Sequence, residues 1–193
     1  MRSGRALLLA LLLILPGLAS AARADSNGPA PLGEFIPAKP PWRAPAVSFA
    51  DAAGRNLSLS DFTGRLVLVN LWATWCAPCR QEMPSLERLQ TRLGDKIAIL
   101  AISEDRGGSK AVAPFVARFG LKAVKTYLDP DSAVGRAFKV DGLPTSFLID
   151  RQGRVLGRVE GGAEWDSPKM LAILDPLLAR DELIKTSFPQ AHP

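Results

Sequence analysis

Histidine and cysteine are both scarce in this chain of 193 residues. The only histidine, His192, stands next to the C-terminus, and the only cysteines, Cys76 and Cys79, lie three positions apart. A protein zinc site generally needs about four ligands from cysteine, histidine or carboxylate side chains. One cysteine pair without a second pair or a nearby histidine argues against a zinc site. We therefore expect no bound metal and no other cofactor.

The chain also lacks the excess of positive charge that favours nucleic acid. Its 24 basic and 19 acidic residues give a formal net charge of +5. Arg2, Arg5 and Arg23 lie in an N-terminal segment with the pattern of a removable signal, and subtracting these three leaves 21 basic against 19 acidic residues, or about +2. So small a net charge attracts nucleic acid weakly, and we expect no nucleic-acid partner.

Residues 1–24 have the pattern of a secretory signal peptide. They combine a basic start, an apolar run, a break at Pro16 and two Ala-x-Ala endings. A retained membrane anchor is the alternative, although the apolar run before Pro16 is only about half of the roughly 20 residues that a membrane span needs. Both interpretations place the rest of the chain outside the cytoplasm, in the periplasm or an equivalent compartment, where cysteines tend to oxidise.

Residues 25–45 are rich in proline, with six in this stretch, and they lack apolar periodicity. This composition predicts an extended, partly disordered linker. The pattern is equally typical of a tether and of a tail left by processing. Phe35, Ile36 and Trp42 either pack onto the following domain or stay loose, and the sequence leaves both possibilities open.

Residues 46–180 have the pattern of one α/β domain, followed by a tail at 181–193. Alternating strands and helices, finished by a hairpin and a helix, indicate a sheet with helices on both faces. Pro168 suits the first turn of the last helix, and we expect Pro176 to bend or end that helix. The predicted strands are 47–49, 57–59, 66–73, 97–103, 124–128, 145–150 and 155–160, and the predicted helices are 77–93, 109–119, 132–138 and 167–178.

The two cysteines lie in LWATWCAPCRQEMPSL, where a predicted strand ends and a helix begins. Backbone N–H groups and the dipole at a helix start stabilise negative charge, so Cys76 should form a thiolate readily. Cys79 shares one helix face with Leu86 and Leu89, so it should turn inward while Cys76 sits at the exposed tip. This asymmetry predicts a redox-active disulfide in which Cys76 attacks and Cys79 resolves. A permanent structural disulfide and two unpaired core cysteines are the alternatives.

Glu82 lies on the same helix face, one turn after Cys79, where a carboxylate is poorly solvated. We interpret it as a proton acceptor for Cys79 whose pKa is tuned by burial. The alternative is a glutamate at the edge of the apolar face that reaches water. Trp165 is interpreted as a structural residue, and Glu104 as a solvated acid in a loop at the edge of the sheet.

The stretch from Val69 to Pro84 resembles the active-site signature of the thioredoxin superfamily. It is most similar to the extracytoplasmic TlpA/ResA-like branch, in which a C-x-x-C-x-x-E-x-P pattern recurs. A second marker, DGLPTSFLID at 141–150, is similar to the cis-proline loop of the superfamily. The segment GAEWDS at 162–167 resembles the closing segment of the TlpA proteins of this branch. The likeness covers residues 45–179, roughly the whole predicted domain.

The resemblance implies a thioredoxin-like fold: a central mixed sheet flanked by helices, with an N-terminal β-hairpin and a helical insertion at 109–140, before the cis-proline loop. It implies that the bond before Pro144 is cis. It also implies that this loop lies against the cysteines and pairs with substrate, so Leu143, Pro144 and Thr145 are carried over as substrate-binding positions.

Three residues around the cysteines, Trp75, Ala77 and Pro78, are also carried over as part of the substrate surface. For Trp75, plain packing is an equally open alternative. Asn70 occupies the position of a buried aspartate in cytoplasmic thioredoxins and cannot accept a proton. This departure makes Glu82 the substitute.

The resemblance further implies an extracytoplasmic thiol–disulfide oxidoreductase, working mainly as a protein-disulfide reductase and as a monomer. An upstream membrane thiol donor would supply electrons, and the targets would be copper-handling proteins in cytochrome oxidase assembly. Reduction of apocytochrome c is an alternative, weakened because Thr145 stands where those relatives tend to have an acid. A copper carrier and a binding domain without turnover are alternatives from other classes.

Overall fold

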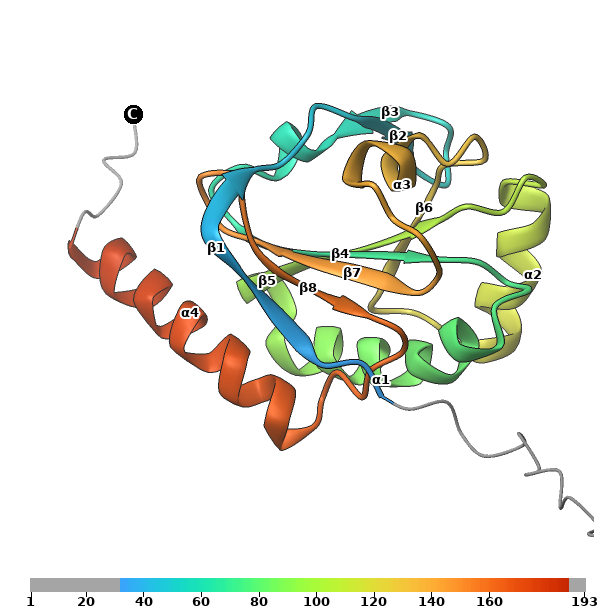
Figure 1. Cartoon of the computed structure of the whole chain (residues 1–193). Helices are drawn as coiled ribbons and strands as arrows, with labels where there is room; N and C mark the ends of the chain where they lie inside the picture. The colour runs from blue at the N-terminus through green and yellow to red at the C-terminus, as the bar shows by residue number, and fades with distance from the viewer. Residues whose placement is uncertain (1–31, 188–193) are drawn as a thin grey trace, which may run out of the picture.

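The computed structural model describes residues 32–187 and contains one eight-stranded mixed sheet with the strand order β1-β8-β7-β4-β5-β6-β2-β3 (Figure 1). The predicted signal segment and His192 lie outside the described residues. The strands are β1 (Phe35–Arg43), β2 (Ser48–Ala50), β3 (Asn56–Ser58), β4 (Leu66–Trp72), β5 (Ile97–Ser103), β6 (Lys125–Leu128), β7 (Thr145–Ile149) and β8 (Arg154–Glu160). The helices are α1 (Ala77–Leu93), α2 (Ser109–Phe119), α3 (Ala133–Phe138) and α4 (Pro168–Ser187).

Strand β4 lies in the middle of the sheet, and every one of its side chains is buried. It runs parallel to β5 and antiparallel to β7. Alternate residues point to opposite faces of a strand. Leu66, Leu68 and Trp72 therefore join one apolar core, whereas Val67 and Val69 join the core on the other face.

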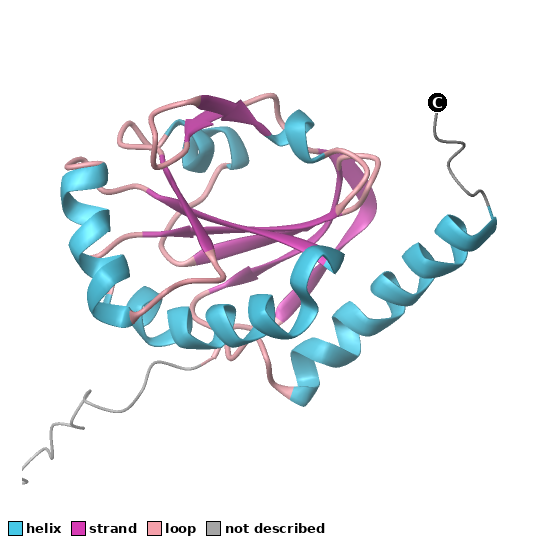
Figure 2. Cartoon of the chain, turned by 180° about the vertical axis from the view of Figure 1, so that it is seen from behind, coloured by secondary structure: helices cyan, strands magenta, loops and turns pink. Residues whose placement is uncertain are grey.

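Helices cover both faces of the sheet, as predicted. Figures 1 and 2 show α1, α2 and α4 on one face, and α3 with the β2–β3 hairpin on the other. The expected hairpin and the helical insertion between β5 and the cis-proline loop are both present, and each strand and helix expected between residues 47 and 160 is found within one residue at each end. The predicted fold class is confirmed.

The predicted extended, partly disordered linker over 25–45 is corrected for residues 35–43, which form β1 and so settle the open alternative in favour of packing onto the domain. This strand pairs antiparallel with β8 at the edge of the sheet, with an irregularity between Pro37 and Trp42. Proline lacks a backbone donor, but an edge strand needs hydrogen bonds on one side only. Glycine at position 157 of β8 lets β1 pack this closely, because a Cβ there would clash with the Phe35 ring at 2.4 Å. The domain thus begins before residue 46.

The predicted tail at 181–193 is also corrected, since α4 extends to residue 187. Pro168 begins this helix as expected, but Pro176 does not end it. Pro176 is exposed, and the apolar residues on either side of it, Leu174 and Leu178, are buried against the sheet. Packing before and after the proline offsets the loss of one helical hydrogen bond, which costs about 3 kcal/mol in an unsupported helix.

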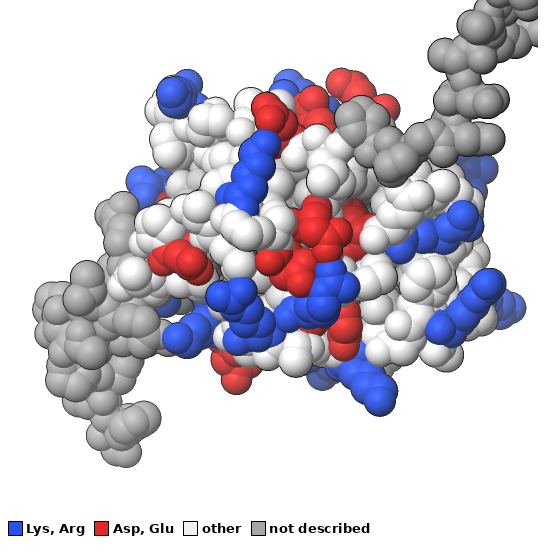
Figure 3. All heavy atoms as spheres, turned by 90° about the horizontal axis from the view of Figure 1, so that it is seen from below, with Lys and Arg blue, Asp and Glu red and all other residues white. Residues whose placement is uncertain are grey.

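The surface carries charges of both signs. Figure 3 shows basic and acidic side chains interspersed over the face that bears α1 and α4. Arg88 of α1, for example, forms ion pairs with both Glu164 and Asp166. Within the described residues, no helix has the length and apolar character needed to cross a membrane.

Candidate redox site

Cys76 and Cys79 are joined by a disulfide at the start of α1. Cys76 is the N-cap residue, and its Sγ accepts a hydrogen bond of 3.3 Å from the backbone N–H of Cys79. The N-terminal end of a helix stabilises negative charge and so favours a thiolate over a thiol. The two cysteines therefore lie, already bonded, where the thiolate of Cys76 would be stabilised once the bond is reduced.

Both cysteines are covered more than the sequence suggested. Cys79 is 0% exposed, which confirms that it turns inward. Cys76 is only 6% exposed, so the expectation of an exposed tip is wrong. Its sulfur is bonded to that of a fully buried partner, and it belongs to the same apolar core as Ala73 and Met83. Cys76 is nevertheless the only one of the two that offers any surface to a substrate.

Glu82 lies one turn after Cys79 and is 3% exposed, so the alternative of a water-exposed glutamate is wrong. Its Oε1 accepts a hydrogen bond of 2.8 Å from Asn70 Nδ2. Its Oε2 accepts bonds from the N–H of Ala163 at 3.0 Å and from Trp165 Nε1 at 3.2 Å. Burial raises the pKa of Glu82 to about 7, although the three hydrogen bonds oppose this rise. Such a carboxyl group can accept and release a proton near neutral pH.

Asn70 and Ser146 form the floor beneath this carboxylate. They are cross-strand partners on β4 and β7, and Asn70 Nδ2 also donates to Ser146 Oγ at 2.9 Å. The sequence reasoning excluded Asn70 as a proton acceptor but missed it as a donor to Glu82. The available signal was the two-residue alternation of β4, which places Asn70 on the same face as Leu68, toward α1.

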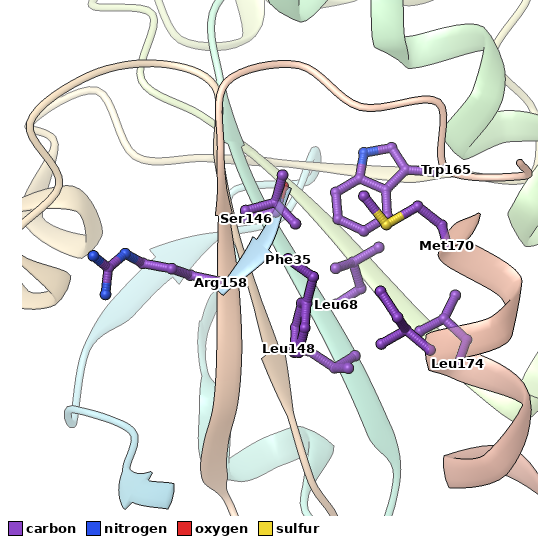
Figure 4. A pocket seen from close by; sticks show the side chains of 10 residues that line it. Phe35, Leu68, Ser146, Leu148, Arg158, Trp165, Met170 and Leu174 are labelled. Carbon is purple, nitrogen blue, oxygen red and sulfur yellow. The ribbon is translucent and has the colours of Figure 1, made fainter. Parts of the chain in front are cut away.

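Trp165 closes the other side of Glu82. Its Nε1 donates to the carboxylate, and its backbone N–H donates to Ser85 Oγ at 3.0 Å. Figure 4 shows its ring beside Met170, at a small cavity of about 10 Å³ that is also lined by Leu174 of α4. Trp165 was expected to be structural only. The structure adds a direct contact with the candidate proton acceptor.

Asp105, which the sequence reasoning missed, braces the loop before the cysteines. It is buried and accepts hydrogen bonds from the N–H and the hydroxyl of Thr74 at 2.8 and 2.6 Å. It also accepts a bond of 2.7 Å from Ser103 Oγ at the end of β5. Its neighbour Glu104 is half-buried rather than a freely solvated acid, and this burial raises the pKa of its carboxyl group.

The bond between Leu143 and Pro144 is cis, as predicted. Pro144 and Thr145 are buried, and Thr145 Oγ1 donates to the carbonyl of Gly142 at 2.7 Å. The hydroxyl of Thr145 is thus engaged within the loop itself. Leu143 is half-buried, so it offers the most accessible side chain of the three predicted substrate positions.

Trp75, Ala77 and Pro78 surround the disulfide. Trp75 is 68% exposed, which argues against plain packing as the reason for this residue. Ala77 is exposed and Pro78 half-buried. Gly162 lies beside Pro78, where a Cβ would be at ordinary contact distance, 3.4 Å from the Pro78 carbonyl oxygen. Of the three residues, Trp75 and Ala77 are thus exposed beside Cys76, and their role as a substrate surface stays a prediction.

Comparison with known proteins identifies what this chain is similar to. The Redoxin family model matches residues 40–174. The thiol-disulfide oxidoreductase ResA of Bacillus anthracis is 36% identical over 119 residues, which cover 61% of this chain and 68% of that protein. The thioredoxin-like protein YneN of Bacillus subtilis is 35% identical over 113 residues, which cover 58% of this chain and 65% of that protein.

Solved structures show the same fold. A putative thiol:disulfide interchange protein DsbE from Chlorobium tepidum has a TM-score of 0.61 and 29% identity, and the match covers 77% of this chain and 99% of that one. A putative thioredoxin from Neisseria meningitidis has a TM-score of 0.62 and 28% identity, with 77% of this chain and 97% of that one covered. These neighbours confirm the thioredoxin-like fold that the motifs implied.

Proposed function

Since this chain belongs to the Redoxin family and is a thiol–disulfide oxidoreductase, we propose that it works mainly as a protein-disulfide reductase outside the cytoplasm. The observation that supports a redox role for the cysteine pair is the buried Glu82 carboxylate, one turn after the inward cysteine, with a pKa of about 7. A structural disulfide needs no proton acceptor at that place. A cysteine that must be deprotonated during each turnover needs such a proton acceptor. The reductive direction rests on the resemblance of residues 69–84 to the TlpA/ResA-like branch.

The exchange reaction begins from the reduced protein. The Cys76 thiolate attacks one sulfur of a substrate disulfide, a new S–S bond joins Cys76 to the substrate, and the displaced sulfur leaves as a thiolate that takes a proton from water. Glu82 then accepts the proton of the Cys79 thiol. The Cys79 thiolate attacks the sulfur of Cys76, and the second substrate sulfur leaves and is protonated, so that two electrons have passed to the substrate.

Completion of the cycle requires a dithiol donor that reduces the Cys76–Cys79 disulfide again. We assign this role to a membrane thiol protein, because residues 1–24 have the pattern of a signal or anchor segment that directs the domain to the membrane or beyond it. Copper-handling proteins of cytochrome oxidase assembly are the proposed substrates, on the resemblance of segments 69–84 and 162–167 to the TlpA proteins. Reduction of apocytochrome c is the competing assignment.

Reduction of insulin disulfides in the presence of dithiothreitol tests the proposed activity. The wild-type chain should accelerate the reaction, and Cys76→Ser should abolish the acceleration. The Cys79→Ser variant, reduced beforehand and mixed with insulin without free dithiothreitol, should trap the mixed disulfide with the substrate, because the resolving thiol is missing. No acceleration over the double serine variant would refute the activity. A reduction potential above about −180 mV, the value of protein disulfide isomerase, would instead assign an oxidase.

A further inference from the structure

The cis-proline loop is a ridge with a hollow on each side. One hollow, of about 750 Å³, lies on the side of Trp75 and Arg106. The other, of about 440 Å³, lies on the side of Trp42. Leu143 lines both hollows. The second hollow extends the surface around the loop away from the cysteines, toward the edge of the sheet.

Trp42 is a large aromatic residue that is partly exposed at the second hollow. It lies on β1, is 41% exposed, and its ring packs against Phe138 of α3 with 5.9 Å between ring centres. Five large apolar side chains are exposed among the described residues, and only Trp42 and Trp75 line these two hollows. Exposed aromatic side chains that border a groove are typical of protein interaction sites.

The chemistry of the second hollow favours an apolar side chain of the partner. Phe138, Phe147, Leu143 and Pro144 line it together with Trp42. The charged residues in its lining are two basic and two acidic ones, so the electrostatic contribution to recognition is balanced. They are Lys139, Arg158, Asp141 and Glu160. Arg158 and Glu160 already pair with each other at 2.6 Å. Trp42 and Leu143 therefore provide the apolar contact that a partner side chain can make.

The location of the hollow identifies the kind of partner. A substrate disulfide can react only when its sulfur reaches Cys76, so the substrate chain must cover the surface beside the redox site. Both hollows are lined by residues 140–143 of the cis-proline loop, so a substrate segment along this loop would pass beside both of them. Trp75 directly precedes Cys76, which places the first hollow next to the reacting sulfur.

We propose that Trp42 is a docking residue for protein substrates. The hollow between β1, α3 and the cis-proline loop accepts a large apolar side chain from an extended segment of the substrate, while a cysteine of the same segment reacts with Cys76. This inference rests on the proposed function. It adds a specificity element from β1, a strand that contributes nothing to the chemistry of the cysteines.

Trp42→Ala tests the proposal, with Ile36→Ala as a matched control. Ile36 lies on the same strand and has a similar exposure of 42%, but it does not line the hollow. Each variant is assayed with oxidised insulin, a polypeptide substrate, and with hydroxyethyl disulfide, which is too small to reach the hollow. Trp42→Phe keeps an aromatic ring and tests whether apolar contact restores the function.

We expect Trp42→Ala to lower kcat/KM for insulin about tenfold, the loss of about 1.4 kcal/mol expected for an aromatic anchor. Its rate with hydroxyethyl disulfide should match that of Ile36→Ala, and Trp42→Phe should recover most of the insulin activity. Equal insulin rates for the two alanine variants would overturn the proposal. A parallel loss with both substrates would also overturn it, because that result shows damage to the redox site. A wild-type chain inactive with both substrates would overturn the proposed function itself.

Discussion

The most informative single perturbation is Glu82→Gln, because glutamine resembles the protonated glutamate and cannot titrate. The wild-type carboxyl group has a pKa of about 7 in the folded protein, against 4.5 as its ordinary value. Burial is the cause, since it disfavours the charged form. The folded protein therefore holds this proton over a pH range in which the unfolded chain has already released it.

The sign of the effect follows from proton linkage. Between pH 4.5 and about 7 the folded state binds more protons than the unfolded state at this position, so the free energy of unfolding falls as the pH rises. The difference between about 7 and 4.5, at about 1.4 kcal/mol per pKa unit, amounts to about 3 kcal/mol. The stabilisation is fully present below pH 4.5 and is lost above pH 7. The Glu82→Gln variant lacks this dependence.

Urea denaturation of the oxidised wild-type and variant proteins, followed by tryptophan fluorescence from pH 4 to pH 8.5, measures the effect. The difference in unfolding free energy between the two proteins should change by about 3 kcal/mol in favour of the variant as the pH rises. Both oxygens of Glu82 accept hydrogen bonds, so the amide NH2 of glutamine must replace an acceptor either for Asn70 or for Ala163 and Trp165. This effect is independent of pH. Two parallel curves would refute the raised pKa and with it the basis of the proton-acceptor role.

Two further predictions concern the surroundings of the site. Trp165→Phe removes one hydrogen bond that stabilises the charged Glu82 carboxylate, so the pKa of Glu82 should rise. The acid limb of the pH–rate profile for mixed-disulfide resolution should therefore move upward by about one pH unit. Ser85→Ala is the control, because it removes the hydrogen bond to the Trp165 backbone and leaves the Glu82 carboxylate bonds intact, so the acid limb should not move. Gly157→Ala should destabilise the fold by about 1–3 kcal/mol in urea denaturation, because its Cβ would lie 2.6 Å from the carbonyl oxygen of Ile36. An alanine at Gly142, where a Cβ meets no atom within 4 Å, should cost far less.

Local sequence pattern was sufficient for the middle of the domain. The residues of β4 are all apolar except Asn70, and α1 begins directly at the cysteine pair, so periodicity and helix-start signals predicted both elements within one residue. The same periodicity placed Cys79 and Glu82 on the buried face of α1. A pattern of this kind is reliable because burial on one face is decided by neighbours three and four residues away.

The proline-rich and proline-containing segments behaved differently, because their structure depends on distant partners. Nothing within 35–43 specifies a strand; β8 provides the hydrogen bonds, and Gly157 provides the space. Pro176 would end an isolated helix, but Leu174 before it and Leu178 after it are both buried in the core under α4. Local propensity fails where tertiary contacts outweigh it.

The exposure of Cys76 and the partners of Glu82 illustrate a second limit. The sequence indicates which face of a helix is buried, but not which atoms cover it. Asn70 comes from β4, and Ala163 and Trp165 come from the loop before α4, about 80 positions further along the chain than Glu82. Because these three donors stabilise the charged form while burial opposes it, the proton affinity of Glu82 is set by the balance between one helix position and two distant segments. A motif centred on the cysteines contains Glu82 itself but not the donors at 163 and 165. The pH range in which the site works is therefore a property of the assembled fold.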